Sequence, residues 1–191
     1  EGETMPATNK EFISTYAKEK FNPAFAQPHN IKIVDIAHAL AYVCRGNGHL
    51  RTFYSVAQHC INCAKEAKAR EYSVKVQFAC LMHDASEAYL SDITRPLKLR
   101  LQNYIDIERE LQATIFKAFG IGELTPIEKT QIEEIDDAML YYEFLELHGD
   151  ILFEKQPELV TQADFEEHYF TVMEEEFLHL FDQLYPQMIG E

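Results

Sequence analysis

Residues 55–69, SVAQHCINCAKEAKA, and residues 73–89, SVKVQFACLMHDASEAY, decide the fold. In both stretches apolar residues recur with the spacing of an α-helix that buries one face. A short polar turn around residues 70–72 separates them. Because buried helix faces must pack against other helices, the two stretches predict the centre of a helical bundle.

The sequence before and after this pair extends the helical pattern. We expect a helix over residues 35–45, ended by residues 46–48, GNG, because glycine adopts the left-handed conformations that terminate helices. Residues 92–96 are expected to form a loop, since Pro96 disfavours helical backbone in the residue before it.

The C-terminal half predicts three more helices. Residues 101–119 resume the helical pattern and stop at Gly120. A helix from Pro126 to about His148 has a threonine cap, a proline in its first position and a glutamate at the third position. Asp164 with Glu167 gives a weaker cap signal for a last helix that reaches Leu184 before Pro186. Since no stretch shows convincing two-residue alternation, the sequence predicts an all-α, single-domain bundle of about six to eight helices.

Composition and charge narrow the class of protein. The chain has 191 residues, 47% of them hydrophobic and 26% charged, which fits one globular domain and excludes disordered and collagen-like classes. The formal net charge of -15 opposes close approach of a phosphate polymer. We therefore expect no nucleic acid polymer as a partner.

The sequence also indicates a compartment. No apolar run approaches the ~18–20 residues that span a bilayer, and no basic segment leads into an apolar one at the N-terminus. We therefore expect a cytoplasmic protein with no membrane partner and with reduced thiols. Residues 1–4, which precede Met5, are interpreted as residues left by expression, so that residues 5–191 form the single domain.

A metal site is predicted around two adjacent residues, His83 and Asp84, which follow an apolar stretch. A buried charge at this position needs compensation. His59 on the preceding helix and Asp136 near the core face of the helix that begins at Pro126 are candidates to complete the site, and Asp137 competes with Asp136 for the last position. Two imidazoles and two carboxylates suit one divalent ion such as Mn, Fe, Co, Ni or Zn, with Mg possible and Ca less suited.

The ordered combination of YSVAQH at residues 54–59, LMHDASEA at 81–88 and Asp136 followed by Glu143 resembles a known family. It is similar to the H…HD…D pattern of HD-domain metal-dependent phosphohydrolases, and most similar to the bacterial 5′-deoxynucleotidase (YfbR-like) branch. The resemblance implies an HD-type helical fold and assigns one divalent metal to His59, His83, Asp84 and Asp136.

The same resemblance implies roles for further residues. Glu87 matches an acidic residue beside the metal-bound water, Asp92 matches the acid of the following loop, and Arg51 matches loosely an arginine that contacts phosphate. Apart from the resemblance, Glu87 lies three residues after Asp84 and is expected near the same helix face, where it could exchange a proton with water.

Two cations and one histidine complete the candidate set. Arg95 and Lys98, together with Arg51, are expected to neutralise a bound phosphate. Two roles remain for His49: it supports the metal or the substrate, or it is a plain loop residue.

Residues 60–63, CINC, form a CxxC motif. A zinc site of that type needs a second pair of cysteines, which Cys44 and Cys80 do not supply. Redox pairs of this kind usually lie at a helix start beside a βαβ unit. We therefore expect Cys60 and Cys63 to serve as small core side chains.

Together these patterns predict a metal-dependent phosphomonoesterase that hydrolyses a small nucleotide, most simply a 5′-deoxynucleoside monophosphate, to nucleoside and phosphate. Two alternatives remain open. The first is an HD hydrolase of nucleoside triphosphates, cyclic dinucleotides or alarmone nucleotides, and the second is a non-catalytic module that binds metal or nucleotide. The resemblance also implies a homodimer.

Overall fold

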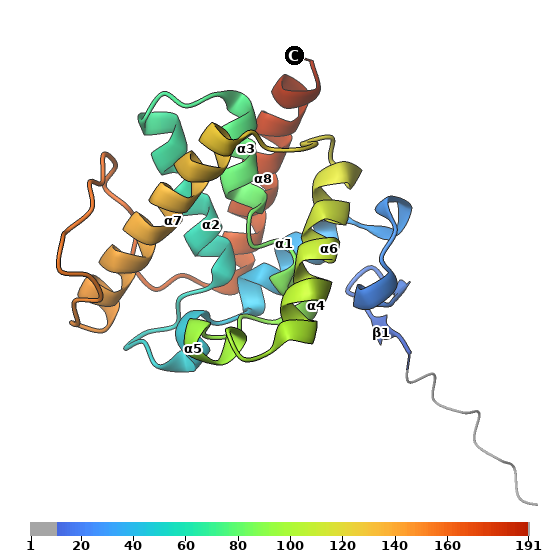
Figure 1. The fold of residues 1–191 in the computed structure, drawn as a ribbon, viewed down its shortest axis with the longest axis horizontal. Coiled ribbons are helices and arrows are strands. Elements are labelled where there is room, and N and C mark those ends of the chain that lie inside the picture. Colours follow the sequence, from blue (N-terminus) through green and yellow to red (C-terminus); the bar gives the residue numbers. More distant parts are fainter. Residues whose placement is uncertain (1–10, 191) are drawn as a thin grey trace, which may run out of the picture.

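The computed structural model describes residues 11–190 and is an all-α bundle, as the sequence predicts (Figure 1). Within the described range the helix number falls in the expected interval of six to eight. The helices are α1 (Ile33–Tyr42), α2 (Val56–Ala69), α3 (Val74–Met82), α4 (Glu87–Leu90), α5 (Arg95–Lys98), α6 (Gln102–Ala118), α7 (Pro126–Leu147) and α8 (Phe170–Ile189).

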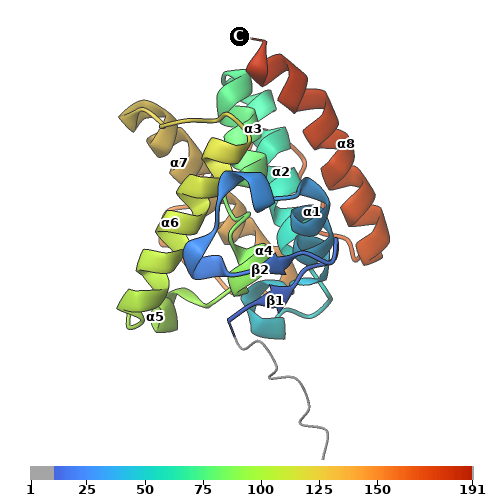
Figure 2. The ribbon, with the colours of Figure 1, turned by 90° about the vertical axis from the view of Figure 1, so that its right-hand side faces the viewer.

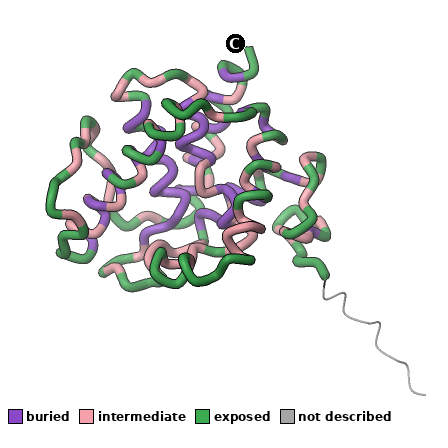
Figure 3. The backbone as a smooth tube through the Cα atoms, viewed as in Figure 1, coloured by how far each residue is buried: buried purple, intermediate pink, exposed green. Residues whose placement is uncertain are grey.

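The core lies where α2 and α3 pack against each other and against α1, α7 and α8. Figure 3 shows the buried backbone gathered in these central helices and the exposed backbone around them. The largest side chains that are fully enclosed include Tyr54, Phe78 and Phe177. Residues 55–69 and 73–89 therefore contain the central helix pair of the bundle.

Side-chain caps fix where the central helices begin. Ser55 accepts a hydrogen bond from the backbone N–H of Gln58, and Ser73 accepts one from that of Val76. The capping box expected at the start of α7 is confirmed, because Thr125 and Glu128 exchange side-chain to backbone hydrogen bonds of 3.3 and 2.7 Å. Each bond satisfies a backbone donor that the first helical turn leaves unpaired.

The single helix expected over residues 73–89 is wrong. α3 ends at Met82, and the four residues before Glu87 form tight turns, in which the N–H of Ala85 bonds to the carbonyl of Met82. The chain bends at His83 and resumes as the short helix α4. His83 and Asp84 both lie in these turns, where Oδ2 of Asp84 is 3.4 Å from Nε2 of His83.

Two other expected segments are corrected. α1 ends at Tyr42 rather than Arg45, and residues 45–48 form a separate 3₁₀ turn in which Gly46 has φ of 61°. Residues 92–96 are not wholly a loop, because Pro96 lies in the first turn of α5, where its missing N–H costs no hydrogen bond.

The last helix differs at both ends. It begins at Phe170 and not near Asp164, whose carboxylate instead binds the N–H of Glu166 and the ring of His168. It also passes through Pro186 and ends at Ile189.

The N-terminal segment forms a small hairpin, which the sequence does not predict. β1 (Ile13–Ser14) pairs antiparallel with β2 (Lys20–Phe21). The N–H of Ala17 in the connecting turn donates to Oδ1 of the buried Asp35 on α1 at 2.6 Å. Figure 2 shows this segment lying over α1 and α6.

No helix among residues 11–190 has both the length and the apolar composition that crossing a bilayer requires. The residues interpreted as remnants of expression, 1–4, lie outside the described part of the chain.

Candidate metal centre

Four side chains from three parts of the sequence lie close together between α2, α3 and α7, and they are called the donor group below. His59 lies in the first turns of α2, His83 and Asp84 lie at the bend after α3, and Asp136 lies in the middle of α7. The Nε2 atoms of His59 and His83 are 3.2 Å apart. Oδ1 of Asp136 is 3.1 Å from His59 Nε2 and 3.7 Å from His83 Nε2. Oδ2 of Asp84 is 3.7 and 3.4 Å from the same two atoms.

Three of these five separations match the spacing of ligands around a metal ion. Bonds of about 2.1 Å in tetrahedral or octahedral geometry place neighbouring donor atoms roughly 3.0–3.4 Å apart, and the two separations of 3.7 Å are slightly longer. The imidazole of His59 is fully buried and that of His83 nearly so, whereas Asp84 and Asp136 are open to solvent on one side. The residues therefore form a possible metal-binding group with an accessible side.

Hydrogen bonds hold both imidazoles with Nε2 facing this point. Nδ1 of His83 lies 2.7 Å from the backbone carbonyl of Cys80, an acceptor, so Nδ1 carries the proton and leaves the Nε2 lone pair free. Nδ1 of His59 lies 2.5 Å from Oε1 of Glu143. Burial alone would raise the pKa of Glu143, but Arg45 and His59 lower that pKa to about 2. Glu143 is therefore an ionised acceptor that fixes the same orientation in His59.

Arg45 lies in the candidate site, although the sequence does not predict it there. Its guanidinium lies 3.1 Å from Oε2 of Glu143 and 3.3 Å from Oδ2 of Asp84. Although burial opposes its charge, the carboxylates of Glu143 and Asp84 raise the pKa of Arg45 well above its ordinary value. It is a permanent positive charge beside the donor group. The only signal in the sequence is its place directly before Gly46, and its partners Asp84 and Glu143 lie 39 and 98 positions away.

A cavity of about 460 Å³ opens on the exposed side of the donor group. Asp84 and Asp136 form part of its wall, and the other polar residues of the wall are Arg45, Glu87, Asp92, Thr94, Arg95, Lys98 and Glu143. Its apolar residues include Leu50, Leu140, Phe144 and Phe153. This volume lies within the usual ~300–1,000 Å³ of small-molecule sites.

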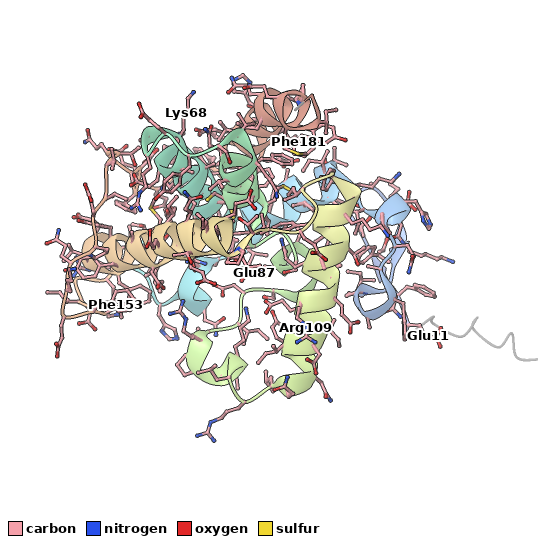
Figure 4. The ribbon with its side chains drawn as sticks, turned by 45° about the horizontal axis from the view of Figure 1, so that its top comes forward. Glu11, Lys68, Glu87, Arg109, Phe153 and Phe181 are labelled. Atoms are coloured by element: carbon pink, nitrogen blue, oxygen red, sulfur yellow. The ribbon has the colours of Figure 1, made fainter. Side chains whose placement is uncertain are left out.

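Glu87 and Asp92 lie where the sequence argument expects acids. Glu87 is buried, and its Oε2 has no hydrogen-bond partner among residues 11–190; Figure 4 shows Glu87 near α6 and α7. Burial, followed by the nearby charges of Asp84 and Asp92, raises the pKa of Glu87 well above its ordinary value. Asp92 accepts a hydrogen bond of 3.2 Å from the N–H of Gly46. The two acids thus differ, because Glu87 favours its protonated form and Asp92 anchors the turn that carries Arg45.

The expected phosphate-binding residues separate into two groups. Lys98 and Arg95 reach the cavity wall, where Lys98 pairs with Glu108 at 2.6 Å and Arg95 lies 3.5 Å from Asp137. Arg51 and His49 are exposed and are not part of that wall. Arg51 instead bonds through its N–H to the carbonyl of Leu147. The turn at residues 46–48 points Arg45, and not Arg51, toward the donor group.

The structure separates the two adjacent aspartates of α7. Asp136 lies beside both imidazoles, whereas the side chain of Asp137 is 55% exposed and faces Arg95. One helical position rotates a side chain by about 100°, which explains why neighbours have such different surroundings. The geometry therefore favours Asp136 in the donor group.

Cys60 and Cys63 are buried and have free thiols, as the sequence argument expects of core side chains. The sequence does not predict their position next to the donor group. Sγ of Cys63 lies 3.6 Å from Nε2 of His59, and His59, Cys63 and His83 together form a group that could hold a metal ion. Cys60, His83 and Asp84 form a second such group, but Sγ of Cys60 lies 4.0 Å from Nδ1 of His83, the nitrogen that bonds to the carbonyl of Cys80.

Two curated relatives match the chain. It is 38% identical over 139 residues to the uncharacterized protein YfdR of Escherichia coli (strain K12), a match that covers 73% of this chain and 74% of YfdR. It is 35% identical over 105 residues to an uncharacterized protein of Rhodobacter capsulatus, covering 52% of this chain and 53% of that protein. No family model matches the chain.

Proposed function

The chain belongs to the family of Escherichia coli YfdR, and we propose that it is a metal-dependent phosphohydrolase that cleaves small nucleotides, most simply 5′-deoxynucleoside monophosphates. One observation carries the proposal. The Nε2 atoms of His59 and His83 lie close to a carboxylate oxygen from each of Asp84 and Asp136, and these two aspartates line a cavity that also holds a buried acid and several cations.

The donor set suits a divalent transition metal. Two imidazoles and two carboxylates are ligands that Mn, Fe, Co, Ni and Zn all accept, and the two anionic groups offset the charge of the ion. When bound, such an ion lowers the pKa of a water molecule and polarises a phosphoryl oxygen. Glu143 and the carbonyl of Cys80 support the site by holding the two rings in orientation.

The cationic side chains of the cavity can attract a phosphate even though the chain as a whole is strongly acidic. Arg45 is fixed between Glu143 and Asp84, so its guanidinium is already oriented before a substrate arrives. Lys98 and Arg95, on α5, line the same cavity. Charged donors placed in advance stabilise the charge that develops on a transferring phosphoryl group.

Glu87 is suited to donate a proton. Because burial, Asp84 and Asp92 raise its pKa, the carboxyl group retains its proton closer to neutral pH than an exposed glutamate does. Cleavage of a phosphomonoester leaves an alkoxide that must be protonated, and an acid in the cavity can supply that proton. The unpartnered Oε2 of Glu87 is available for this transfer.

The apolar residues of the cavity wall favour an organic ester over inorganic phosphate or pyrophosphate. Phe144 on α7 and Phe153 on the segment after it are among them. Aromatic faces of this kind can hold a nucleobase by stacking. A nucleoside monophosphate would match both kinds of residue at once, with its phosphate at the donor group and its base against the phenylalanines.

The test is phosphate release by the purified full chain after removal of metal and reloading with Mn²⁺ or Co²⁺. The substrates are 5′-deoxynucleoside and 5′-ribonucleoside monophosphates, with triphosphates and cyclic dinucleotides as rival phosphates. We expect phosphate from the monophosphates and a loss of more than about a hundredfold in Asp136→Asn.

Asp137→Asn is the matched control, because it makes the same change one position further along α7, outside the donor group. It should retain activity within about twofold. Equal loss in both variants, or no hydrolysis of any phosphate with any metal, would contradict the proposal. Metal-dependent binding of nucleotides without turnover would instead favour a non-catalytic module.

A further inference from the structure

A thiol lies beside the two imidazoles on the side formed by α2. Cys63 follows His59 by four positions on that helix, so both side chains project from the same face. Cys63 is almost fully buried, and its Sγ lies 3.6 Å from Nε2 of His59. This is the nitrogen that faces the donor group, because Nδ1 of the same ring is bonded to Glu143.

The position of the sulfur matches that of a ligand. Metal bonds of about 2.3 Å to sulfur and about 2.1 Å to nitrogen, separated by a tetrahedral angle, place the two donor atoms roughly 3.6 Å apart. Sγ of Cys63 and the ligand atoms of His59 and His83 all lie within 4.8 Å of one another. A single ion can therefore reach both imidazoles and the thiol.

We propose that Cys63 is an additional ligand of the metal centre and that it makes the site bind thiophilic divalent ions, such as zinc, in preference to manganese or magnesium. This inference rests on the metal site of the proposed function. The set for a thiophilic ion is His59, His83 and Cys63, completed by one of the two carboxylates. Binding forms a metal–sulfur bond and releases the thiol proton to solvent.

The chemistry of sulfur gives the selectivity. Thiolate ligands favour zinc, whereas magnesium and manganese are bound well by carboxylates. The same two histidines can thus hold an ion on the carboxylate side, which faces the cavity, or closer to the sulfur, which faces the core. An ion drawn toward Cys63 moves away from the side on which a substrate enters. Zinc should accordingly bind more tightly than manganese and support less turnover.

Cys60 provides a matched control on the same helix. It is equally buried, but its Sγ lies 4.0 Å from Nδ1 of His83, and that nitrogen already bonds to the carbonyl of Cys80. Cys60→Ser therefore removes a buried sulfur that does not face the Nε2 atoms of His59 and His83.

The experiment uses the metal-free full chain and its Cys63→Ser and Cys60→Ser variants, each checked for folding by circular dichroism. Cobalt is added and the near-ultraviolet thiolate-to-cobalt charge-transfer band is recorded. We expect the band in the wild type and in Cys60→Ser, and its loss in Cys63→Ser. In competition titrations, Cys63→Ser should lower zinc affinity at least about tenfold and leave manganese affinity within about threefold. X-ray absorption of the zinc-loaded wild type should show a sulfur neighbour at about 2.3 Å, a result that needs no variant.

The outcomes separate this inference from the proposed function. Cobalt binding without a sulfur band, or a band that persists in Cys63→Ser, overturns the role of Cys63, even if the manganese-loaded protein releases phosphate. A sulfur band in a protein that hydrolyses no phosphate supports the role of Cys63 and removes the proposed activity. Failure of the wild type to bind any of these ions overturns both.

Discussion

Nδ1 of His59 lies 2.5 Å from Oε1 of Glu143, and the other oxygen of that carboxylate binds Arg45 at 3.1 Å. The three side chains form a buried chain behind the donor group. Glu143 connects an imidazole on α2 to a guanidinium that also contacts Asp84. The arrangement orients one ligand and, through Arg45, restrains a second.

Glu143→Gln should weaken metal binding without dismantling the fold. The amide oxygen of glutamine can still accept from Nδ1 of His59, but the negative charge that Arg45 needs is lost. Changes to residues that support a metal ligand typically cost about 10–100-fold in affinity, and we expect a loss of that size for Mn²⁺ or Co²⁺ measured by calorimetric titration. Glu146→Gln, an exposed position on the same helix, should bind like the wild type. An unchanged affinity in Glu143→Gln would show that His59 needs no such support.

Metal removal should lower thermal stability. An ion at about a hundred times its dissociation constant stabilises the native state by roughly 2.7 kcal/mol, which for a chain of this size raises the melting temperature by roughly 5–10 °C. We expect this rise when Mn²⁺, Co²⁺ or Zn²⁺ is added to chelated protein and followed by differential scanning fluorimetry. Asp136→Asn should show little of it and Asp137→Asn most of it. Identical melting curves with and without every ion would argue against a metal centre.

Substitutions of Lys98 and Arg51 test whether the phosphate binds in the cavity or on the surface around it. Lys98 reaches the cavity wall, whereas Arg51 does not. Lys98→Met should therefore lower kcat/KM for a nucleoside monophosphate by about tenfold, equivalent to about 1.4 kcal/mol of transition-state stabilisation. Arg51→Met should leave kcat/KM within about twofold. The reverse order in steady-state kinetics would mean that the phosphate sits outside the cavity and that the family resemblance places the arginine correctly.

The sequence predicts those features of the site that depend on single residues in their own helices. His83 and Asp84 follow from a polar pair after an apolar stretch, whereas His59 and Asp136 are candidates that the family resemblance assigns to the same site. All four lie close together in the structure. The start of α7 follows from the local pattern at Thr125, because its capping box needs only neighbouring residues. Local chemistry is sufficient in these cases.

Other features depend on tertiary contacts and have no local signal. The bend at His83 has neither glycine nor proline, so periodicity alone predicts a continuous helix there. Arg45 acquires its role only when α7 brings Glu143 beside it. Pro186 remains inside α8, whose packing against α1 and α3 outweighs the missing hydrogen bond. In each case the deciding contact joins residues far apart in the chain.

Glu66 fixes the long segment between α7 and α8 that carries Phe153 to the cavity. Its fully buried carboxylate accepts from the N–H of Val160 at 2.9 Å and from the N–H and hydroxyl of Thr161 at 2.8 and 2.7 Å, and it pairs with Arg70 at 2.8 Å. Burial alone would raise the pKa of Glu66, but these hydrogen bonds lower it. The carboxylate is therefore ionised when the protein is folded.

Glu66→Gln should destabilise the protein by about 2 kcal/mol at neutral pH, because the amide cannot serve all these donors. A folded pKa below the unfolded value of about 4.3 means that the stabilisation is fully present above about that pH and is lost as pH falls through the folded pKa. The difference in free energy of unfolding between wild type and variant, measured by urea titration, should therefore shrink as the solution becomes more acidic than about pH 4. Glu158→Gln, on the exposed side of the same segment, should cost less than about 0.5 kcal/mol at every pH. A Glu66→Gln penalty that stays constant with pH would show that the folded carboxyl is not ionised preferentially, and that these contacts hold the segment by shape rather than by charge.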